Sequence, residues 1–294
     1  MATQNGTTDS NQKLKILMIH GFTQTGRLFE IKTKAVKKAL EKAIPPAPKP
    51  GHLKQYPGGL EFHYPTAPIK LEASSIPGYD GDQEDPEAYG WWRRKGEGEP
   101  FHYEGIETGL GKIAEILQND GPFQGVIGFS QGGAAAGMVA SLLEPERREA
   151  FEAAQKNGGM GYPDAFTNGL GQTMHPPLKF AVSYSGFGAA TNPLYKAFYQ
   201  PKIRTPMLHY LGTVDTVVSE ERSLRLVEAC VDGQGADGGV PRVIYHPGGH
   251  FLPSSQKQYV ATLAAFIREA VGEVENTSAQ NGQEERVEDM DVPF

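Results

Sequence analysis

Cysteine is almost absent from this chain, which has one, Cys230, among 294 residues. A single thiol excludes a disulfide-based scaffold and any zinc or iron–sulfur site built on several cysteines. A chain without disulfides is typical of a reducing compartment, so we expect a cytoplasmic protein. Cys230 follows the apolar positions Leu226 and Val227 on a helical pattern, which predicts a core residue and not a nucleophile.

Long apolar runs, a secretory signal and an excess of basic residues are also missing. No stretch approaches the roughly 18 apolar residues that a transmembrane helix needs. The N-terminal MATQNGTTDSNQ lacks the basic and apolar regions of a signal peptide. The net charge of −7 argues against a nucleic-acid binder, which would show a basic patch. We therefore expect no membrane span and no nucleic-acid partner.

The negative charge is concentrated at the C-terminal end. Residues 272–294 hold seven acidic side chains and one arginine, so the rest of the chain is close to neutral. We expect an acidic disordered tail there, and a disordered N-terminus over the polar residues 1–12. Residues 13–271 are predicted to form a single domain with loop insertions at about 65–105 and 144–177.

Short β-rich runs alternate with helical patterns through this predicted domain. Strands separated by helices indicate βαβ units, and hence an α/β fold with a mostly parallel central sheet and helices on both faces. The expected strands are 14–20, 60–64, 125–129, 179–184, 207–211 and 242–245. The expected helices are 28–43, 106–119, 131–143, 219–230 and 255–271, with weaker signals at the start of 144–177 and at 194–199.

The segment GFSQG, residues 128–132, has the G-x-S-x-G pattern. Its serine, Ser130, directly follows a predicted strand and precedes a helix of very small residues. This context is typical of a nucleophile elbow, in which a strained turn exposes the hydroxyl above the sheet. The alternative is that Ser130 is only the N-cap of an ordinary helix.

A serine nucleophile needs a base, and in an α/β-hydrolase fold the acid and the histidine follow the serine in that order. Asp215 follows the strand MLHYL, and His250 follows the strand RVIYH with two glycines before it. The predicted triad is therefore Ser130, Asp215 and His250. Asp232 and Asp237 are alternative acids, although both follow a helix instead of a strand.

An oxyanion formed on a substrate carbonyl needs backbone N–H donors. The residue after the nucleophile, Gln131, supplies one candidate, and Phe22 in the loop after the first strand supplies the other. Because backbone groups act here, the side chains of these two residues carry no information about the role.

Aromatic residues gather in the long loop before residue 105. Trp91 and Trp92 are candidates to line a substrate pocket, with anchoring of the loop in the core as an equal alternative. Phe187, which follows another strand, is a further candidate. Arg93 and Arg94 are interpreted as a solvated charge pair, with contact to an acidic carrier or a phosphopantetheine as the alternative.

No spacing of ligands indicates a metal site and no phosphate-binding loop is present, so we expect neither metal nor cofactor.

Four segments together resemble the FSH family of serine hydrolases: LMIHGFTQTG, VIGFSQGG, LGTVDTVV and HPGGHFLP. This α/β-hydrolase family is common in fungi and includes the ovarian-cancer-associated hydrolase of animals. The resemblance covers roughly residues 13–271. It implies a serine esterase or thioesterase acting on small-molecule acyl esters or thioesters. By motif match, it implies the triad Ser130, Asp215 and His250. Some fungal members release acyl or polyketide chains from a synthase, which makes an acyl carrier protein domain a candidate partner.

Two other functions stay open from the sequence. An acyltransferase or cyclase would resolve the acyl-enzyme with a nucleophile other than water. A catalytically silent α/β-hydrolase would serve as a binding module, although such proteins usually lack a triad member and none is missing here.

Overall fold

The computed structural model describes residues 11–76, 86–233, 239–254 and 256–272. The stretches 1–12 and 272–294, predicted to be disordered, lie outside the described residues except for positions 11, 12 and 272.

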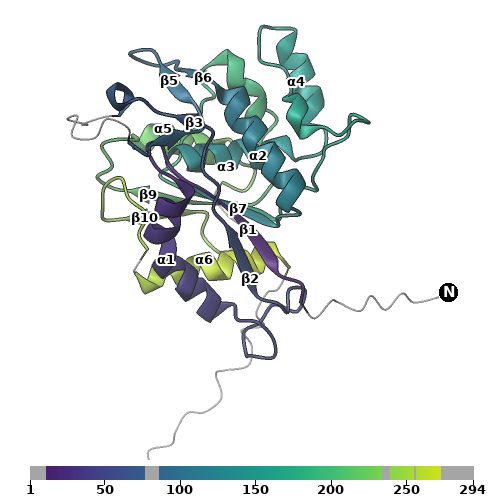
Figure 1. The fold of residues 1–294 in the computed structure, drawn as a ribbon, viewed down its shortest axis with the longest axis vertical. Coiled ribbons are helices and arrows are strands. Elements are labelled where there is room, and N and C mark those ends of the chain that lie inside the picture. Colours follow the sequence, from purple (N-terminus) through teal and green to yellow (C-terminus); the bar gives the residue numbers. More distant parts are fainter. Residues whose placement is uncertain (1–10, 77–85, 234–238, 255, 273–294) are drawn as a thin grey trace, which may run out of the picture.

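A single parallel sheet of six strands forms the centre of the structure (Figure 1). The prediction of an α/β fold with a parallel sheet is confirmed. All six predicted strands are present, with bounds that differ by one residue or none at each end. In spatial order they are β10 (Val243–His246), β9 (Met207–Gly212), β8 (Phe180–Tyr184), β7 (Gly125–Phe129), β1 (Leu14–Ile19) and β2 (Leu60–His63).

Helices cover both faces of this sheet because its strands are apolar on both sides. In β1, Ile16 and Met18 belong to one hydrophobic cluster, while Leu17 and Ile19 belong to the other. The first cluster is completed by α1 (Gly26–Ala43) and α6 (Lys257–Ala270). The opposite face is covered by α2 (Ile106–Asp120), α3 (Gln131–Leu142) and α5 (Glu220–Glu228), and α4 (Arg147–Gln155) packs outside α3 (Figure 1).

The predicted loop insertion at 65–105 contains more structure than its sequence suggested. Two short antiparallel ladders lie within it, and their strands of two or three residues are too short to produce a recognisable alternation. They are β3 (Ile69–Lys70) with β4 (Tyr89–Gly90), and β5 (Arg93–Lys95) with β6 (His102–Glu104). Short 3₁₀ helices occur at Ala73–Ser75, Asp164–Phe166 and Pro193–Phe198.

The strand order changes direction at β1. β1 lies between β2 and β7, so the chain leaves β1 toward one side and later returns on the other. The loops that follow β1 and β7 therefore diverge at neighbouring strand ends, which is where open α/β sheets bind ligands. Phe22 lies in the first of these loops and Ser130 in the second.

Candidate active site

Ser130 occupies a sharp turn between β7 and α3. Its backbone has φ 53° and ψ −116°, a strained conformation for a residue other than glycine. The turn is possible only because its flanks are glycines. A Cβ on Gly128 would lie 1.9 Å from the carbonyl oxygen of Gly132, and one on Gly132 would lie 2.0 Å from that of Ile19. The geometry is that of a nucleophile elbow and not of an ordinary N-cap, because the Ser130 side chain accepts no capping hydrogen bond.

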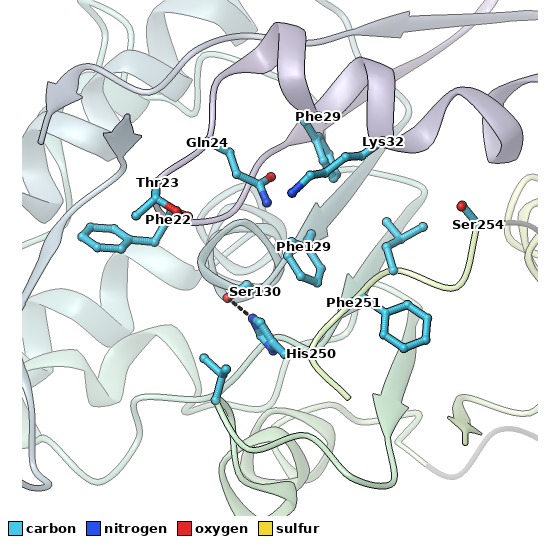
Figure 2. Close-up of a pocket in the computed structure, with 12 residues that line it drawn as sticks. Phe22, Thr23, Gln24, Phe29, Lys32, Phe129, Ser130, His250, Phe251 and Ser254 are labelled. Carbon is cyan, nitrogen blue, oxygen red and sulfur yellow. Dashed lines mark hydrogen bonds between the residues drawn. The ribbon is translucent and has the colours of Figure 1, made fainter. Parts of the chain in front are cut away.

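The structure brings Ser130, His250 and Asp215 together, although 120 residues separate the first two. His250 Nε2 lies 2.9 Å from Ser130 Oγ, and His250 Nδ1 lies 2.8 Å from Asp215 Oδ2. Figure 2 shows the contact between the serine and the histidine. Both distances are those of hydrogen bonds, so a proton on Ser130 has a direct path to the imidazole. The His250 side chain is 16% exposed and that of Asp215 only 5%.

The second carboxylate oxygen of Asp215 accepts hydrogen bonds from the backbone N–H groups of Val217 and Val218, each at 2.9 Å. Burial raises the pKa of Asp215, but the hydrogen bonds from Val218, His250 and Val217 lower it by more. The net pKa lies below its ordinary value. The carboxylate is therefore ionised when it contacts His250. Of the alternative acids, Asp232 pairs with Arg242 at 2.6 Å instead, and Asp237 lies outside the described residues.

Phe22 and Gln131, the two candidate oxyanion donors, lie on neighbouring strand ends beside the serine. Both line a cavity that also contains Ser130. Within the described residues, neither backbone N–H has a hydrogen-bond acceptor in the protein. Two free N–H groups beside the candidate nucleophile form an arrangement that can stabilise a developing negative charge on a carbonyl oxygen.

The Gln131 side chain has a structural role that the sequence did not reveal. Its Oε1 accepts a 2.7 Å hydrogen bond from Trp91 N, and its Nε2 donates one of 2.8 Å to Trp92 O. This buried amide therefore fixes the aromatic loop to the start of α3. The identity of residue 131 matters for the loop, independently of its backbone N–H.

His20 holds the same loop from the other side. Its Nε2 accepts a hydrogen bond from Ala67 N at 2.9 Å, so the proton is on Nδ1, which donates to Gly21 O at 2.7 Å. Burial lowers the pKa of His20 to about 4, so the ring is neutral at physiological pH. Its carbonyl oxygen accepts a 3.0 Å hydrogen bond from Trp91 Nε1.

Two cavities meet at Ser130. One, of about 520 Å³, lies on the side of His250, with Gln24 and Lys32 on one side of it and His250 and Phe251 on the other (Figure 2). The other, of about 440 Å³, is lined by aromatic residues and by four cationic side chains. Phe22, Ser130 and Val217 line both. A bound substrate can therefore extend from the serine in two directions.

Of the three predicted pocket residues, two line a cavity beside Ser130 and one does not. Trp92 and Phe187 line the second cavity. Trp91 lines neither cavity beside Ser130 and is fully buried, so its geometry is that of a loop anchor and not of a pocket wall. Val217 and Arg222 line the second cavity without having been predicted as site residues. These residues reach the cavity because separate loops pack together, and no local sequence pattern predicts that packing.

Three further features belong to the described part of the chain. No three or more His, Cys, Asp or Glu side chains gather there as a metal site would require. Cys230 is buried, and burial raises the pKa of its thiol to about 12, consistent with the predicted core role. Within the same residues, no helix combines the length and apolar character needed to cross a bilayer.

A serine on a strand–helix turn, with an acid and a histidine after later strands of a parallel sheet, defines the α/β-hydrolase class. Within that class, the chain matches the family described as "Serine hydrolase (FSH1)" over residues 9–262, and it belongs to this family. The family predicted from the sequence is thereby confirmed.

Individual proteins show how far the similarity extends. A dihydrofolate reductase of Schizosaccharomyces pombe is 31% identical, over 87% of this chain and 47% of that protein. Esterase OVCA2 of Danio rerio is 27% identical, over 82% of this chain and 91% of that protein. The chain spans about half the length of the first curated relatives it matches.

A solved structure supports the fold. The crystal structure of Zea mays acyl-protein thioesterase 2 superposes with a TM-score of 0.50 at 20% identity, over 87% of this chain and 95% of that one. At this identity the similarity shows the shared α/β-hydrolase fold.

Proposed function

We propose that this protein hydrolyses carboxylic esters or thioesters of acyl chains through an acyl-enzyme on Ser130. The observation that carries the proposal is the unbroken hydrogen-bond chain from Asp215 through His250 to Ser130, at 2.8 and 2.9 Å. Membership of a serine hydrolase family and similarity to a protein named esterase support the same chemistry.

The reaction begins when His250 Nε2 accepts the Ser130 proton as Oγ bonds to the acyl carbon. Asp215 holds the proton on Nδ1 and stabilises the imidazolium that forms. The backbone N–H groups of Phe22 and Gln131 donate to the oxyanion. His250 then gives its proton to the leaving oxygen or sulfur as the bond to the acyl carbon breaks. Water, deprotonated by the same histidine, then attacks the acyl carbon. The bond from that carbon to Ser130 Oγ breaks, and His250 returns the proton to Oγ as the acid is released.

A carrier-bound thioester is a second candidate substrate, and helix α1 favours it. This helix has six Lys or Arg residues against two Glu. Lys32, on the same helix, lines the cavity beside His250. An acidic acyl carrier protein would meet a basic surface next to the site where its thiol departs.

An acyltransferase or cyclase would use the same acyl-enzyme with another acceptor, which product analysis distinguishes from hydrolysis. We also propose the cytoplasm as the compartment, because the single cysteine is a buried thiol.

Ser130→Ala tests the proposal. We expect it to abolish both hydrolysis of p-nitrophenyl esters and labelling by a fluorophosphonate probe, with an unchanged thermal unfolding midpoint. Ser74→Ala, at an exposed serine that lines neither cavity beside Ser130, is the matched control and keeps both activities. Labelling that persists in Ser130→Ala would contradict the nucleophile assignment. Absence of any turnover by the wild-type chain would favour a non-catalytic binding module.

A further inference from the structure

The two cavities at Ser130 have different roles in an acyl transfer. In the tetrahedral intermediate, the leaving atom must lie within reach of the proton on His250 Nε2, while the acyl chain points away from it. His250 lines only the 520 Å³ cavity, which we name the leaving-group cavity. The 440 Å³ cavity on the other side, lined by Gln131 and Trp92, is then the acyl cavity.

Aromatic rings form the wall of the acyl cavity nearest the serine. Trp92 and Tyr103 lie with ring centroids 5.3 Å apart, and Phe187 meets Tyr103 edge-on at 6.2 Å. Burial raises the pKa of the Tyr103 hydroxyl to about 12, so the wall is uncharged. Such a surface suits the methylene groups of an acyl chain.

The remainder of the acyl cavity is cationic. Arg93, Arg94, Lys95 and Arg222 line it together with one carboxylate, Glu104, which pairs with Lys95 at 2.5 Å. Arg222 shares Glu99 with Arg225. Within the described residues, no carboxylate pairs with Arg93 or Arg94. Among the described residues that line the cavity, the positive charges therefore outnumber the carboxylates.

The guanidinium groups are held in position by aromatic contacts. Arg94 and Arg222 lie over the ring of Phe101, with Cζ 4.6 and 5.4 Å from its centroid. Arg222 also lies 4.4 Å over Phe187. The Nε atoms of Arg93 and Arg222 are buried without a hydrogen-bond acceptor, and the 3.2 Å approach of Arg222 Nε to Glu99 lacks hydrogen-bond geometry. These two Nε atoms are out of reach of solvent, so a ligand in the cavity would be bound by the terminal nitrogens of the guanidinium groups.

We propose that the acyl cavity selects acyl chains that end in a carboxylate, which binds between Arg94 and Arg222 while the chain lies along Trp92, Tyr103 and Phe187. The inference rests on the proposed acyl-enzyme chemistry and adds a substrate class to it. Arginine suits this task because its planar group binds a carboxylate through two parallel hydrogen bonds.

The experiment compares two series of p-nitrophenyl esters, mono-esters of the dicarboxylic acids from adipate to sebacate and the same esters with the free acid capped as a methyl ester. Shorter diacids are avoided because their mono-esters cyclise without enzyme. We expect kcat/KM of the wild type to favour the free acid about tenfold at its best length, the gain from one charge-assisted hydrogen bond. The preference should decrease as salt is added, because the recognising charges are partly exposed.

Arg222→Gln and Arg94→Gln should each lower the free-acid to capped-ester ratio toward one. Arg94 is exposed, so its variant tests the proposal even if Arg222→Gln fails to fold. Arg225→Gln is the matched control. Arg225 belongs to the Glu99 ion pairs but does not line the cavity, so this variant should keep the wild-type ratio.

Equal turnover of acid and capped ester by the wild type, or an unchanged ratio in both variants, overturns the inference and leaves the proposed function intact. No turnover of any ester, with no fluorophosphonate labelling, overturns the proposed function and this inference with it.

Discussion

The side-chain nitrogen of Gln131 donates a 2.8 Å hydrogen bond to the carbonyl oxygen of Trp92. One residue thus connects two parts of the candidate site. Its backbone N–H is a candidate oxyanion donor, and its side chain positions a wall of the acyl cavity. The loop that carries Trp92 is therefore held by the same residue that follows the candidate nucleophile.

Gln131→Met separates these two contributions. Methionine keeps the backbone N–H and most of the buried volume but removes both hydrogen bonds to the loop. We expect kcat/KM for an octanoyl ester to fall about tenfold, because losing buried hydrogen bonds costs about 1–3 kcal/mol and the proposed acyl cavity brings Trp92 against the longer chains. An acetyl ester should be affected less. Steady-state kinetics over a chain-length series measures this, and an equal loss for both esters would show that Gln131 acts on the reacting carbonyl instead.

Asp215→Asn tests the role of the acid. The Asn oxygen can keep the hydrogen bonds from Val217 and Val218, which turns its NH₂ group toward His250 Nδ1. That contact favours the tautomer with the proton on Nε2, which cannot accept a proton from Ser130. We expect kcat to fall by about 10³–10⁴ with little change in stability.

The control for this variant is Asp232→Asn, whose carboxylate pairs with Arg242. It should retain wild-type kcat while losing some stability. Comparable kcat in the two variants would exclude Asp215 as the triad acid.

The candidate triad could be predicted from sequence because its order and its strand-end positions are local properties. Each of Ser130, Asp215 and His250 follows a recognisable strand, and parallel strands bring their carboxyl ends to one edge of the sheet. The strain at Ser130 could be predicted for the same reason, since the flanking glycines are visible in the chain.

The acyl cavity could not be predicted in this way. Arg222 meets Phe101 and Phe187 only because α5, the loop at residue 101 and the end of β8 converge in space. Trp91 and Trp92 are adjacent in sequence, yet one anchors the loop and the other lines the cavity. Which of the two faces the cavity depends on the packing of short strands, and these have too few residues to show an alternating sequence pattern.

Gly132→Ala should destabilise the fold, because the added Cβ would lie 2.0 Å from the backbone oxygen of Ile19, which cannot move without disturbing β1. We expect a loss of about 3 kcal/mol or more in the free energy of unfolding. Gly111→Ala is the matched control in α2, where a Cβ has no atom within 4 Å. It should raise stability by about 0.5–1 kcal/mol, since alanine is the better helix former. Denaturant unfolding of both variants measures the contrast. A Gly132→Ala protein of wild-type stability would mean that strand and helix can separate at the elbow, and the strained turn at Ser130 would then lose its structural cause.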